Sequence, residues 1–511
     1  MTTLDPTHHC AWRVEAERLR SQVQVCHDLL DQMQARLNKL EQMQARLDKF
    51  EQMQERIAYL ERVLWGRNSE KMPTPSEELR QQRRGSGGSK ASGNKARAAK
   101  ALARKQLPEI EVVHEVGEDS GVCESCGQPA NKRLGEGKVS FTYTYVPARF
   151  ERHKHIRRTM ACPCGSHIVT ARGPAKVVDK GRYGPGFVAH VITSKCADSL
   201  PIYRLQKQCK RLGVPVARST MTELFHRGAE LLTPIHGRIL DIIAKQPIVQ
   251  ADETTMPIQR KGGCKRGYVW TFLSGDMIGY RFSGSRSGET PRSVLGATSG
   301  VLVVDAYTGY NAVTTPEQRE RAGCLAHVRR KYFDALGSAP KEARHGMDLI
   351  LEVYRVEHEA AEAGKTRSAE HSRMRKSRSR AAMDALVQWC ENEQGNHLPR
   401  GPLGKAIHYT LAQRKALRCF IDNVDIPVDN NASERALRVM ALGRKNYLFV
   451  GHIQAGRNLA VLHTLVACCE LHQVNPMAYL TDMLIRVQDT PSSRIDELLP
   501  WRWKPPDPVT A

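Results

Sequence analysis

The N-terminal part of the chain has the apolar spacing of a coiled coil. From Leu19 to Leu40, apolar residues recur in alternating steps of four and three, which is the seam of a helix that packs against another helix. From Asp31 the sequence repeats every ten residues (DQMQARLNKL, EQMQARLDKF, EQMQERIAYL), a period that locally overwinds a supercoil. We therefore expect residues 1–72 to form a coiled-coil oligomerisation helix; the alternative is a solvated single helix.

Residues 73–108 change abruptly to Pro, Ser, Gly, Lys and Arg. Nine basic residues and no acidic residue lie between Arg80 and Lys105. A segment of this composition cannot bury enough apolar surface to fold by itself, so we expect a flexible basic linker. Such a linker either follows the phosphates of a nucleic acid or is a solvated tether.

Residues 109–175 are strand-like, with alternating apolar and polar positions in VSFTYTYV, and they contain two close pairs of cysteines. Four thiolates suit tetrahedral Zn²⁺, so we predict a small zinc-binding ribbon with one structural ion; incidental thiols are the alternative. The predicted ligands are Cys123, Cys126, Cys162 and Cys164. The second pair is closer than the usual spacing, and the nearby histidines that could replace a ligand are His153, His155 and His167.

The segment RFERHKHIRR, between the two cysteine pairs, is strongly basic. On a zinc-stapled ribbon this strand would be a DNA-binding face, and otherwise it is a solvated strand. Its candidate DNA-binding residues are Arg149, Arg152, Lys154, Arg157 and Arg158.

Residues 176–245 contain two helical stretches around a turn at Gly213. The second stretch begins at Arg218, as in a helix-turn-helix whose second helix presents its N-terminal side chains to base edges. Helix pairs joined by a glycine turn are also common in ordinary folds, so a purely structural role is the alternative. Arg218 is a further DNA-binding candidate.

From Pro247 the pattern becomes mixed α/β, in the order strand, strand, strand, helix, strand. The first strand (PIVQAD) ends in Asp252 and the fourth (VLVVD) ends in Asp305. In a ribonuclease-H-like sheet the first and fourth strands are neighbours, so the two carboxylates would meet. Paired carboxylates bind Mg²⁺ through hard oxygen ligands, and two such ions can act on a phosphodiester. The alternative is that both aspartates are turn or cap residues.

A third acidic ligand is expected from a downstream helix. Glu434, in VDNNASERALRVMALG, opens a helix that we expect to end at Gly443. The spacing from Asn431 to Glu434 also fits a capping box, so capping and catalysis are not separable locally. Asp429 is a competing acid, although a role in turning the loop before the helix is favoured.

A third metal-like pattern, Cys324-x2-His327, precedes the basic run Arg329-Arg330-Lys331. We interpret it as a packed sheet edge followed by a phosphate-facing helix rather than as a metal site. The core is expected to occupy residues 246–340 and 421–450, interrupted by a charged helical insertion at 341–420. A helical region at 451–511 follows. The remaining DNA-binding candidates are Arg329, Arg330, Arg435 and Arg438.

Composition narrows the class of partner. The 511 residues include 77 Lys and Arg against 54 Asp and Glu, a formal net charge of +23, which favours nucleic acid over a membrane surface. With 41% hydrophobic residues the chain can bury a real core. The first thirty residues lack the apolar centre of a signal peptide, so we expect a cytoplasmic, nucleoid-associated protein whose cysteines are thiols or metal ligands.

Several blocks together resemble the bacterial insertion sequence 66 transposases, in family order and over nearly the whole chain. They are LWGRNSEKM (64–72), the paired cysteines, LPIYRLQKQCKRLGV, ADETTMPI (251–258), VVDAYTGYN (303–311), GCLAHVRRKYFDA (323–335), DNNASERALR (429–438), GRKNYLFVG (443–451) and NPMAYLTDMLIRV (475–487). The ten-residue seam repeats depart from the family pattern and concern oligomer register rather than chemistry.

The resemblance implies a DDE transposase with a ribonuclease-H-like core, in which Asp252, Asp305 and Glu434 match the acidic triad. It also implies the helical insertion before Glu434, the zinc-finger-like segment and small element-encoded accessory proteins. We therefore expect an enzyme that binds the terminal inverted repeats of its element and uses two Mg²⁺ or Mn²⁺ ions to cleave a strand and transfer the 3′-hydroxyl to target DNA. The alternatives are a nuclease of the same fold without strand transfer and a DNA-binding regulator without catalysis.

Overall fold

The computed structural model describes residues 15, 17–25, 27, 29–30, 32–44, 53, 148–161, 168–171, 173–179 and 181–505. The predicted zinc ligands, Cys123, Cys126, Cys162 and Cys164, lie outside the described residues, as does the linker 73–108. Contacts group residues 1–60 and 150–511 into one unit and residues 61–149 into another, and the description below concerns the first.

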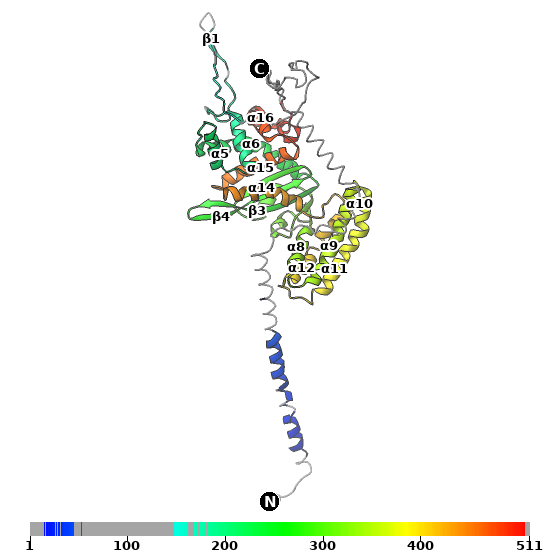
Figure 1. Ribbon diagram of the computed structural model, residues 1–511. Coiled ribbons are helices and arrows are strands. Elements are labelled where there is room, and N and C mark those ends of the chain that lie inside the picture. The colour runs from blue at the N-terminus through cyan, green and yellow to red at the C-terminus, as the bar shows by residue number, and fades with distance from the viewer. Residues whose placement is uncertain are drawn as a thin grey trace, which may run out of the picture. The chain divides into compact units, whose positions relative to one another are not determined.

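The described part of the chain is mixed α/β (Figure 1). Its strands are β1 (Thr159–Ala161), β2 (Ile168–Thr170), β3 (Ile248–Arg260), β4 (Gly263–Ser274), β5 (Met277–Ser283), β6 (Gly300–Val303) and β7 (Arg319–Ala322). Its first α-helices are α4 (Pro185–Cys196), α5 (Ile202–Arg211), α6 (Arg218–Ala244), α7 (Glu289–Leu295), α8 (Leu325–Ala335) and α9 (Pro340–Glu362). The others are α10 (Ala369–Met374), α11 (Arg380–Glu393), α12 (Pro402–Ala412), α13 (Cys419–Asp422), α14 (Asn431–Tyr447), α15 (Ile453–Leu471) and α16 (Pro476–Asp489).

The central sheet has five strands in the order β5-β4-β3-β6-β7. Strands β3, β4 and β5 form an antiparallel meander, whereas β6 and β7 run parallel to β3. The predicted adjacency of the first and fourth strands is confirmed. The predicted strand end at Asp252 is wrong, because β3 continues eight residues further, to Arg260, paired with β4.

Helices cover both faces of the meander. Gly279 of β5 faces α6, since a Cβ atom there would meet Leu240, whereas Phe282, three residues on, packs against Gly456 of α15. Because successive strand residues point to opposite faces, α6 and α15 lie on opposite sides of β5. Tyr280 shares the face of Phe282 and donates its hydroxyl to the carbonyl of Ala436, which places α14 on the α15 side.

A second hydrophobic core lies among helices α8, α9, α11 and α12, beside the β6–β7 edge of the sheet. Its buried residues include Leu325, Tyr332, Ile350, Leu386 and Ile407. Val303 of β6 belongs to the same cluster, so this helical group is packed directly onto the strand that leads to Asp305.

Strand β7 has no apolar pattern, and a buried arginine holds it in the sheet. The side chain of Arg319 is almost fully buried and donates to the carbonyls of Ala244, Gln246 and Val301. These bonds tie the β7 edge to the end of α6 and to β6, which compensates for burying the guanidinium.

The remaining described segments differ from or extend the sequence predictions. Residues 149–158 are not a strand, and all of them except the half-buried Phe150 are exposed; the short β1–β2 pair begins at Thr159. Described residues between 15 and 44 are helical, and their apolar seam, including Leu19, Leu37 and Leu40, is exposed. No helix in the described ranges combines the length and apolar character needed to cross a bilayer.

Candidate active site

The strand register brings Asp252 and Asp305 near each other. The parallel pairing of β3 with β6 aligns Gln250 with Val303, so Asp252 lies two residues further along β3 and Asp305 two residues beyond the end of β6. The negative charge of Asp305 acts on Asp252, which confirms that the two carboxylates are neighbours. Across β4 and β5, Asp252 aligns with Thr271 and Thr271 with Tyr280, whose hydroxyl contacts α14. Since aligned residues share a face, Asp252 lies on the side of the sheet covered by α14.

Helix α14 is attached to β3 by the residue before it. Asn430 is buried, and its side-chain nitrogen donates to the carbonyl of Ala251, at 2.7 Å. Gln250 donates to the Asn430 side-chain oxygen, at 3.3 Å, and to the Asp429 carbonyl. The first turn of α14, which carries Glu434, is therefore held beside Asp252.

Glu434 has an incompletely paired carboxylate. Its Oε1 atom is buried without a hydrogen-bond partner, and His327 Nε2 lies 3.8 Å away. Its Oε2 atom lies 3.5 Å from the guanidinium of Arg330, on α8. Both contacts are too long for strong hydrogen bonds, so this carboxylate keeps unused acceptor capacity.

The capping-box alternative for Glu434 finds no support in these hydrogen bonds. Helix α14 begins at Asn431, and its N-cap residue, Asn430, makes no side-chain capping bond. Asn431 donates its side chain to Asp429 instead, at 2.7 Å. Glu434 is therefore the fourth residue of the helix, one position beyond the third residue that a capping box requires. The helix also continues past the predicted end at Gly443, to Tyr447.

Burial and like charges raise the pKa of Asp252 to about 7. Burial is the largest cause, and the charges of Glu253, Asp305 and Glu434 act in the same direction. The backbone N–H of Glu253, 2.8 Å from Asp252 Oδ1, opposes them. Burial and neighbouring carboxylates disfavour the ionised form of Asp252, and a cation bound beside it would stabilise that form.

Glu253 is an acidic neighbour that the sequence reasoning missed. It follows Asp252 and so points to the opposite face of β3, where Tyr310 donates to it at 2.6 Å and Arg286 at 2.5 Å. The guanidinium of Arg286 also stacks on Tyr307, 3.9 Å from the ring centre. The buried carboxylate of Glu253 therefore already has hydrogen-bonding and ion-pairing partners. The signal in the sequence was that Glu253 directly follows Asp252, because adjacent residues of a strand point to opposite faces.

The oxygen donors of Asp252, Asp305 and Glu434 suit Mg²⁺ or Mn²⁺, which prefer carboxylate ligands. The orphaned Oε1 of Glu434 and the raised pKa of Asp252 fit a site that lacks its positive charge. Across the described residues, no group of three or more His, Cys, Asp or Glu side chains is already arranged to hold an ion.

The two competing patterns have structural partners of their own. Asp429 accepts from the Tyr354 hydroxyl at 2.9 Å and from the backbone and side chain of Asn431, so it orders the loop before α14. Cys324 is buried, its Sγ accepts from the backbone N–H of Asn430, and burial raises the pKa of its thiol to about 12.

The DNA-binding candidates differ in how far they are exposed to solvent. Arg329 is buried, so it is not presented to a partner in solution. The exposed candidates are Arg149, Arg152, Lys154, Arg157, Arg158, Arg218, Arg330, Arg435 and Arg438.

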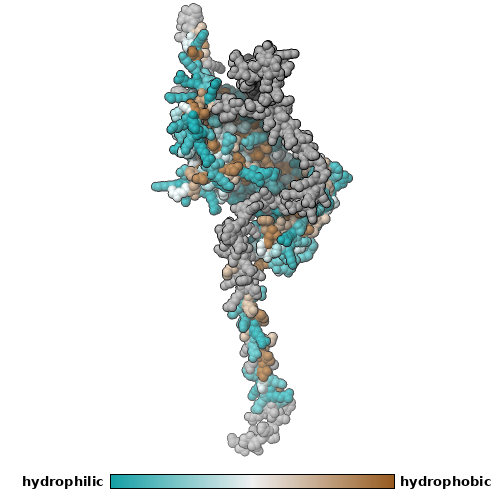
Figure 2. Space-filling view, in the orientation of Figure 1, coloured by the Kyte–Doolittle hydropathy of each residue, from teal (hydrophilic) through white to brown (hydrophobic). Residues whose placement is uncertain are grey.

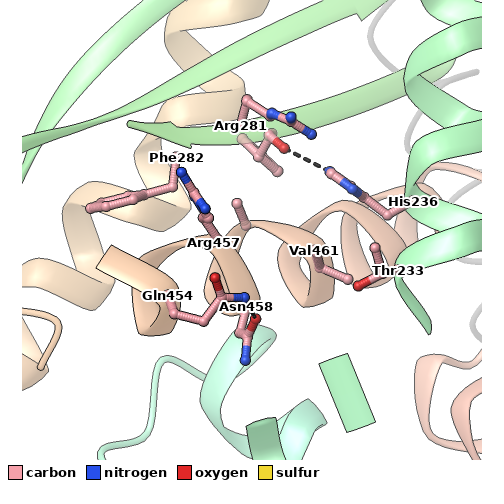
Figure 3. Close-up of a pocket in the computed structure, with 10 residues that line it drawn as sticks. Thr233, His236, Arg281, Phe282, Gln454, Arg457, Asn458 and Val461 are labelled. Carbon is pink, nitrogen blue, oxygen red and sulfur yellow. Dashed lines mark hydrogen bonds between the residues drawn. The ribbon is translucent and has the colours of Figure 1, made fainter. Parts of the chain in front are cut away.

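A separate cavity of about 280 Å³ lies at the open edge of β5, between α6 and α15 (Figure 3). Arg281, Arg457 and Gln454 line it, and His236 closes it with a 2.8 Å hydrogen bond to the Tyr280 carbonyl. None of the three candidate acids lines this cavity. It is therefore distinct from the site at Asp252.

One carboxylate on a strand, a second just after the neighbouring strand and a third on the first turn of a covering helix are typical of metal-dependent enzymes that act on phosphate esters. Comparison with known families gives a specific result. Residues 180–458, more than half of the chain, match the model described as "Transposase IS66 family". Residues 464–501 match the IS66 C-terminal element, and residues 120–165 match the zinc-finger binding domain of transposase IS66. The chain belongs to the IS66 transposase family.

Relatives of similar length occur in Sinorhizobium fredii. Uncharacterized protein y4jD is 33% identical over 423 residues, which is 78% of this chain and 81% of the relative. Uncharacterized protein y4qI is 31% identical over 437 residues, 81% of this chain and 80% of the relative. The similarity therefore extends over most of each protein.

Proposed function

We propose that this chain is a DDE transposase whose acidic triad is Asp252, Asp305 and Glu434. In this proposal the five-stranded sheet is a ribonuclease-H-like core, interrupted by the helical insertion before α14. The observation that carries it is the β3–β6 pairing, with Asp252 and Asp305 each two residues past an aligned pair, together with the unpaired oxygen of Glu434 on the helix that covers β3. Membership of a transposase family supports the same assignment.

Residues around the proposed triad would position its carboxylates before any ion binds. Asn430 fixes the distance between the strand that carries Asp252 and the helix that carries Glu434. Arg330, whose guanidinium is half exposed and lies 3.5 Å from Glu434, would place a positive charge beside a DNA phosphate bound at this site. Two Mg²⁺ or Mn²⁺ ions on these carboxylates would activate first water and then the 3′-hydroxyl, and would stabilise the leaving oxygen.

The other parts of the protein have proposed roles in assembly and DNA binding. The zinc-finger match at 120–165 covers the four predicted cysteine ligands, which supports one structural Zn²⁺ per chain. The N-terminal seam would join protomers so that two element ends are held together, with small accessory proteins as further partners. Elemental analysis of the purified chain should find the zinc, and a Cys123→Ser, Cys126→Ser variant should lose it.

The test uses a duplex that carries one end of the encoding element, with Mg²⁺ or Mn²⁺ and a target plasmid. Asp252→Asn and Asp305→Asn should lower strand cleavage by at least about 100-fold while binding to the duplex is retained, because only the charge that holds the cation is removed. Asp241→Asn, an exposed acid on α6, is the matched control and should cleave normally.

The same assay separates the alternatives. Cleavage without a joined product would indicate a nuclease. Metal-dependent binding without cleavage by the wild-type protein would indicate a regulator. Normal cleavage by Asp252→Asn would contradict the proposed acidic triad.

A further inference from the structure

The β3–β4 hairpin extends well beyond the rest of the sheet. It turns at Lys261–Gly262, and all residues from Gln259 to Arg266 are exposed. Figure 1 shows this hairpin projecting from the core beside the β4 label, and Figure 2 shows the same projection as mostly hydrophilic. Gly262 has φ +77° and Gly263 has φ +155°, values that allow the tight two-residue turn. We call residues 259–266 the ribbon tip.

The ribbon tip carries only positive charge. From Thr254 to Ser274 the sequence contains no Asp or Glu, whereas Arg260, Lys261, Lys265 and Arg266 all lie in the tip. No carboxylate within the described ranges forms an ion pair with any of these four cations. Four cations on one hairpin repel each other, so a polyanionic partner would stabilise them.

The hairpin is braced up to the start of its tip. The backbone N–H of Val450 donates to the Pro257 carbonyl, and Gln259 donates to the Val450 carbonyl, both at 2.9 Å. Nearer the site, Arg444 of α14 donates to the Thr255 hydroxyl at 2.8 Å. The tip is therefore a fixed extension of the strand that carries Asp252.

Helix α14 continues the positive surface from the acids toward the hairpin. Arg435, Arg438 and Lys445 are exposed along it, and Glu434 is its only acidic residue. The helix starts beside Ala251, where Asn430 is bonded, and its C-terminal part reaches Thr255 through Arg444. The α14 helix therefore runs along β3 from Ala251 to Thr255, and the ribbon tip begins four residues further along the same strand, at Gln259.

We propose that the ribbon tip and the exposed cations of α14 bind the DNA duplex that flanks the cleaved phosphate. This inference rests on the proposed function, because it takes Asp252 as the place of cleavage. Lys261 is nine strand residues from Asp252, a length of about 30 Å. With a rise of 3.4 Å per base pair, the tip reaches roughly 9 base pairs from the cut. A two-stranded ribbon also has dimensions that the DNA major groove admits.

The first experiment measures binding, without catalysis, in full-length Asp252→Asn protein. A 40-base-pair duplex that ends at the element terminus is titrated at several salt concentrations. Neutralising the tip (R260Q, K261Q, K265Q and R266Q together) should reduce the slope of log affinity against log salt by about 2 to 4, since each phosphate contact contributes about 0.9. The control K341Q, R344Q, K405Q and R414Q removes the same charge from the helical insertion and should leave the slope near that of the parent.

Equal slopes in the parent and the tip variant would overturn the ribbon proposal while leaving the triad test intact. The same slope reduction in the control would overturn it too, because only total charge would then matter. Normal cleavage by Asp252→Asn would contradict the proposed function but would not bear on DNA binding by the ribbon tip. The melting temperatures of the parent and the tip variant should agree, since the substituted side chains are all exposed.

The second experiment uses a thiol that the ribbon tip already contains. Cys264 is exposed, whereas the other free cysteines of the described ranges are buried or half-buried. A photocrosslinker attached to Cys264 should mark bases about 7 to 11 positions from the cut, as the strand length requires. Cys264→Ser gives the background, and Cys264→Ser, Gln388→Cys places the label on α11 as a matched control. Crosslinks next to the cut, or none above background, would overturn the proposal.

Discussion

The Oε1 atom of Glu434 is a buried acceptor without a donor, which is costly unless a ligand completes it. Glu434→Gln keeps the shape and removes the charge. We expect cleavage to fall by orders of magnitude while melting temperature and end binding stay near wild type, since the long contacts to His327 and Arg330 contribute little stability. A Gln variant that still cleaves and joins ends at a near-normal rate would exclude Glu434 as a ligand. Glu317→Gln, an exposed acid, is the control.

His236 makes stability sensitive to acid. Burial lowers the pKa of His236 to about 4, although its hydrogen bond to the Tyr280 carbonyl partly opposes this. The unfolded chain takes up the proton near pH 6.5, so the stability contributed by neutral His236 is complete above pH 6.5 and is lost as pH falls toward 4. Between pH 7.5 and 5 the loss should be ~2 kcal/mol.

Denaturant unfolding at pH 7.5 and 5 tests this expectation. His236→Gln retains a donor for the Tyr280 carbonyl but cannot titrate, so its unfolding free energy should change less with pH than that of wild type. His155→Gln, at an exposed position, should behave as wild type. Identical pH dependence in all three proteins would contradict the assignment.

At the residue scale, the strand order predicted that the strands before Asp252 and Asp305 are neighbours, which the β3–β6 pairing confirms. It did not predict Glu253, because the first strand was expected to end at Asp252. The partners of Glu253, Arg286 and Tyr310, are far apart in sequence and come together only through folding. The lack of a capping bond at Asn430 likewise depends on where α14 meets β3.

The side-chain amide of Asn430 bonds directly to β3, at a junction with α14 that Gln250 and Arg444 also bridge. Asn430→Ala leaves the Ala251 carbonyl without its side-chain donor and should cost about 1 to 3 kcal/mol of stability. Because the junction also sets the separation of Asp252 and Glu434, we expect a higher Mg²⁺ concentration for half-maximal cleavage. Leu386→Ala, in the second core, should lower stability comparably without changing that concentration. An unchanged Mg²⁺ requirement in Asn430→Ala would show that the amide is only structural.

Among the elements, those with a regular apolar pattern were predicted and those ordered by polar groups were not. The strand continuation after Asp252 does alternate, with Met256 and Ile258 buried, but polar neighbours obscure it. Strand β7 reads RERA and gives no apolar signal, because its inward residue is Arg319, satisfied by carbonyls from α6 and β6. The α14 helix continues past Gly443 because Tyr447 packs against that glycine.

At the scale of the whole molecule, we propose that the exposed N-terminal seam joins protomers. Its helical residues, including Leu19, Val23 and Leu37, are more than half exposed in the single chain. Such a seam is stabilised by burying it against another helix. Removing residues 1–66 should therefore lower the mass measured by light scattering without lowering the melting temperature of the rest. A truncated protein that keeps the full-length mass would assign assembly to another interface.

Residue patterns predicted the order of the segments: a coiled coil, a basic linker, a cysteine-containing ribbon, a helix pair, an α/β region with two aspartates, and charged helices before Glu434. The family resemblance implied that these helices are an insertion and that the three acids form one triad. The pairing of β3 with β6, and the bond from Asn430 to Ala251, now connect the two sides of that insertion through particular atoms.

The opposite orientation of Asp252 and Glu253 also gives the sheet two electrically unlike sides. On one side Asp252 adds to the negative charge of Asp305 and Glu434. On the other, Glu253 is already neutralised by Arg286 and Tyr310. A cation that approaches from the Glu253 side meets a guanidinium first. The strand thus separates a carboxylate whose pKa is raised from one that is already paired, and we expect a cation to bind on the side of Asp252 rather than on that of Glu253.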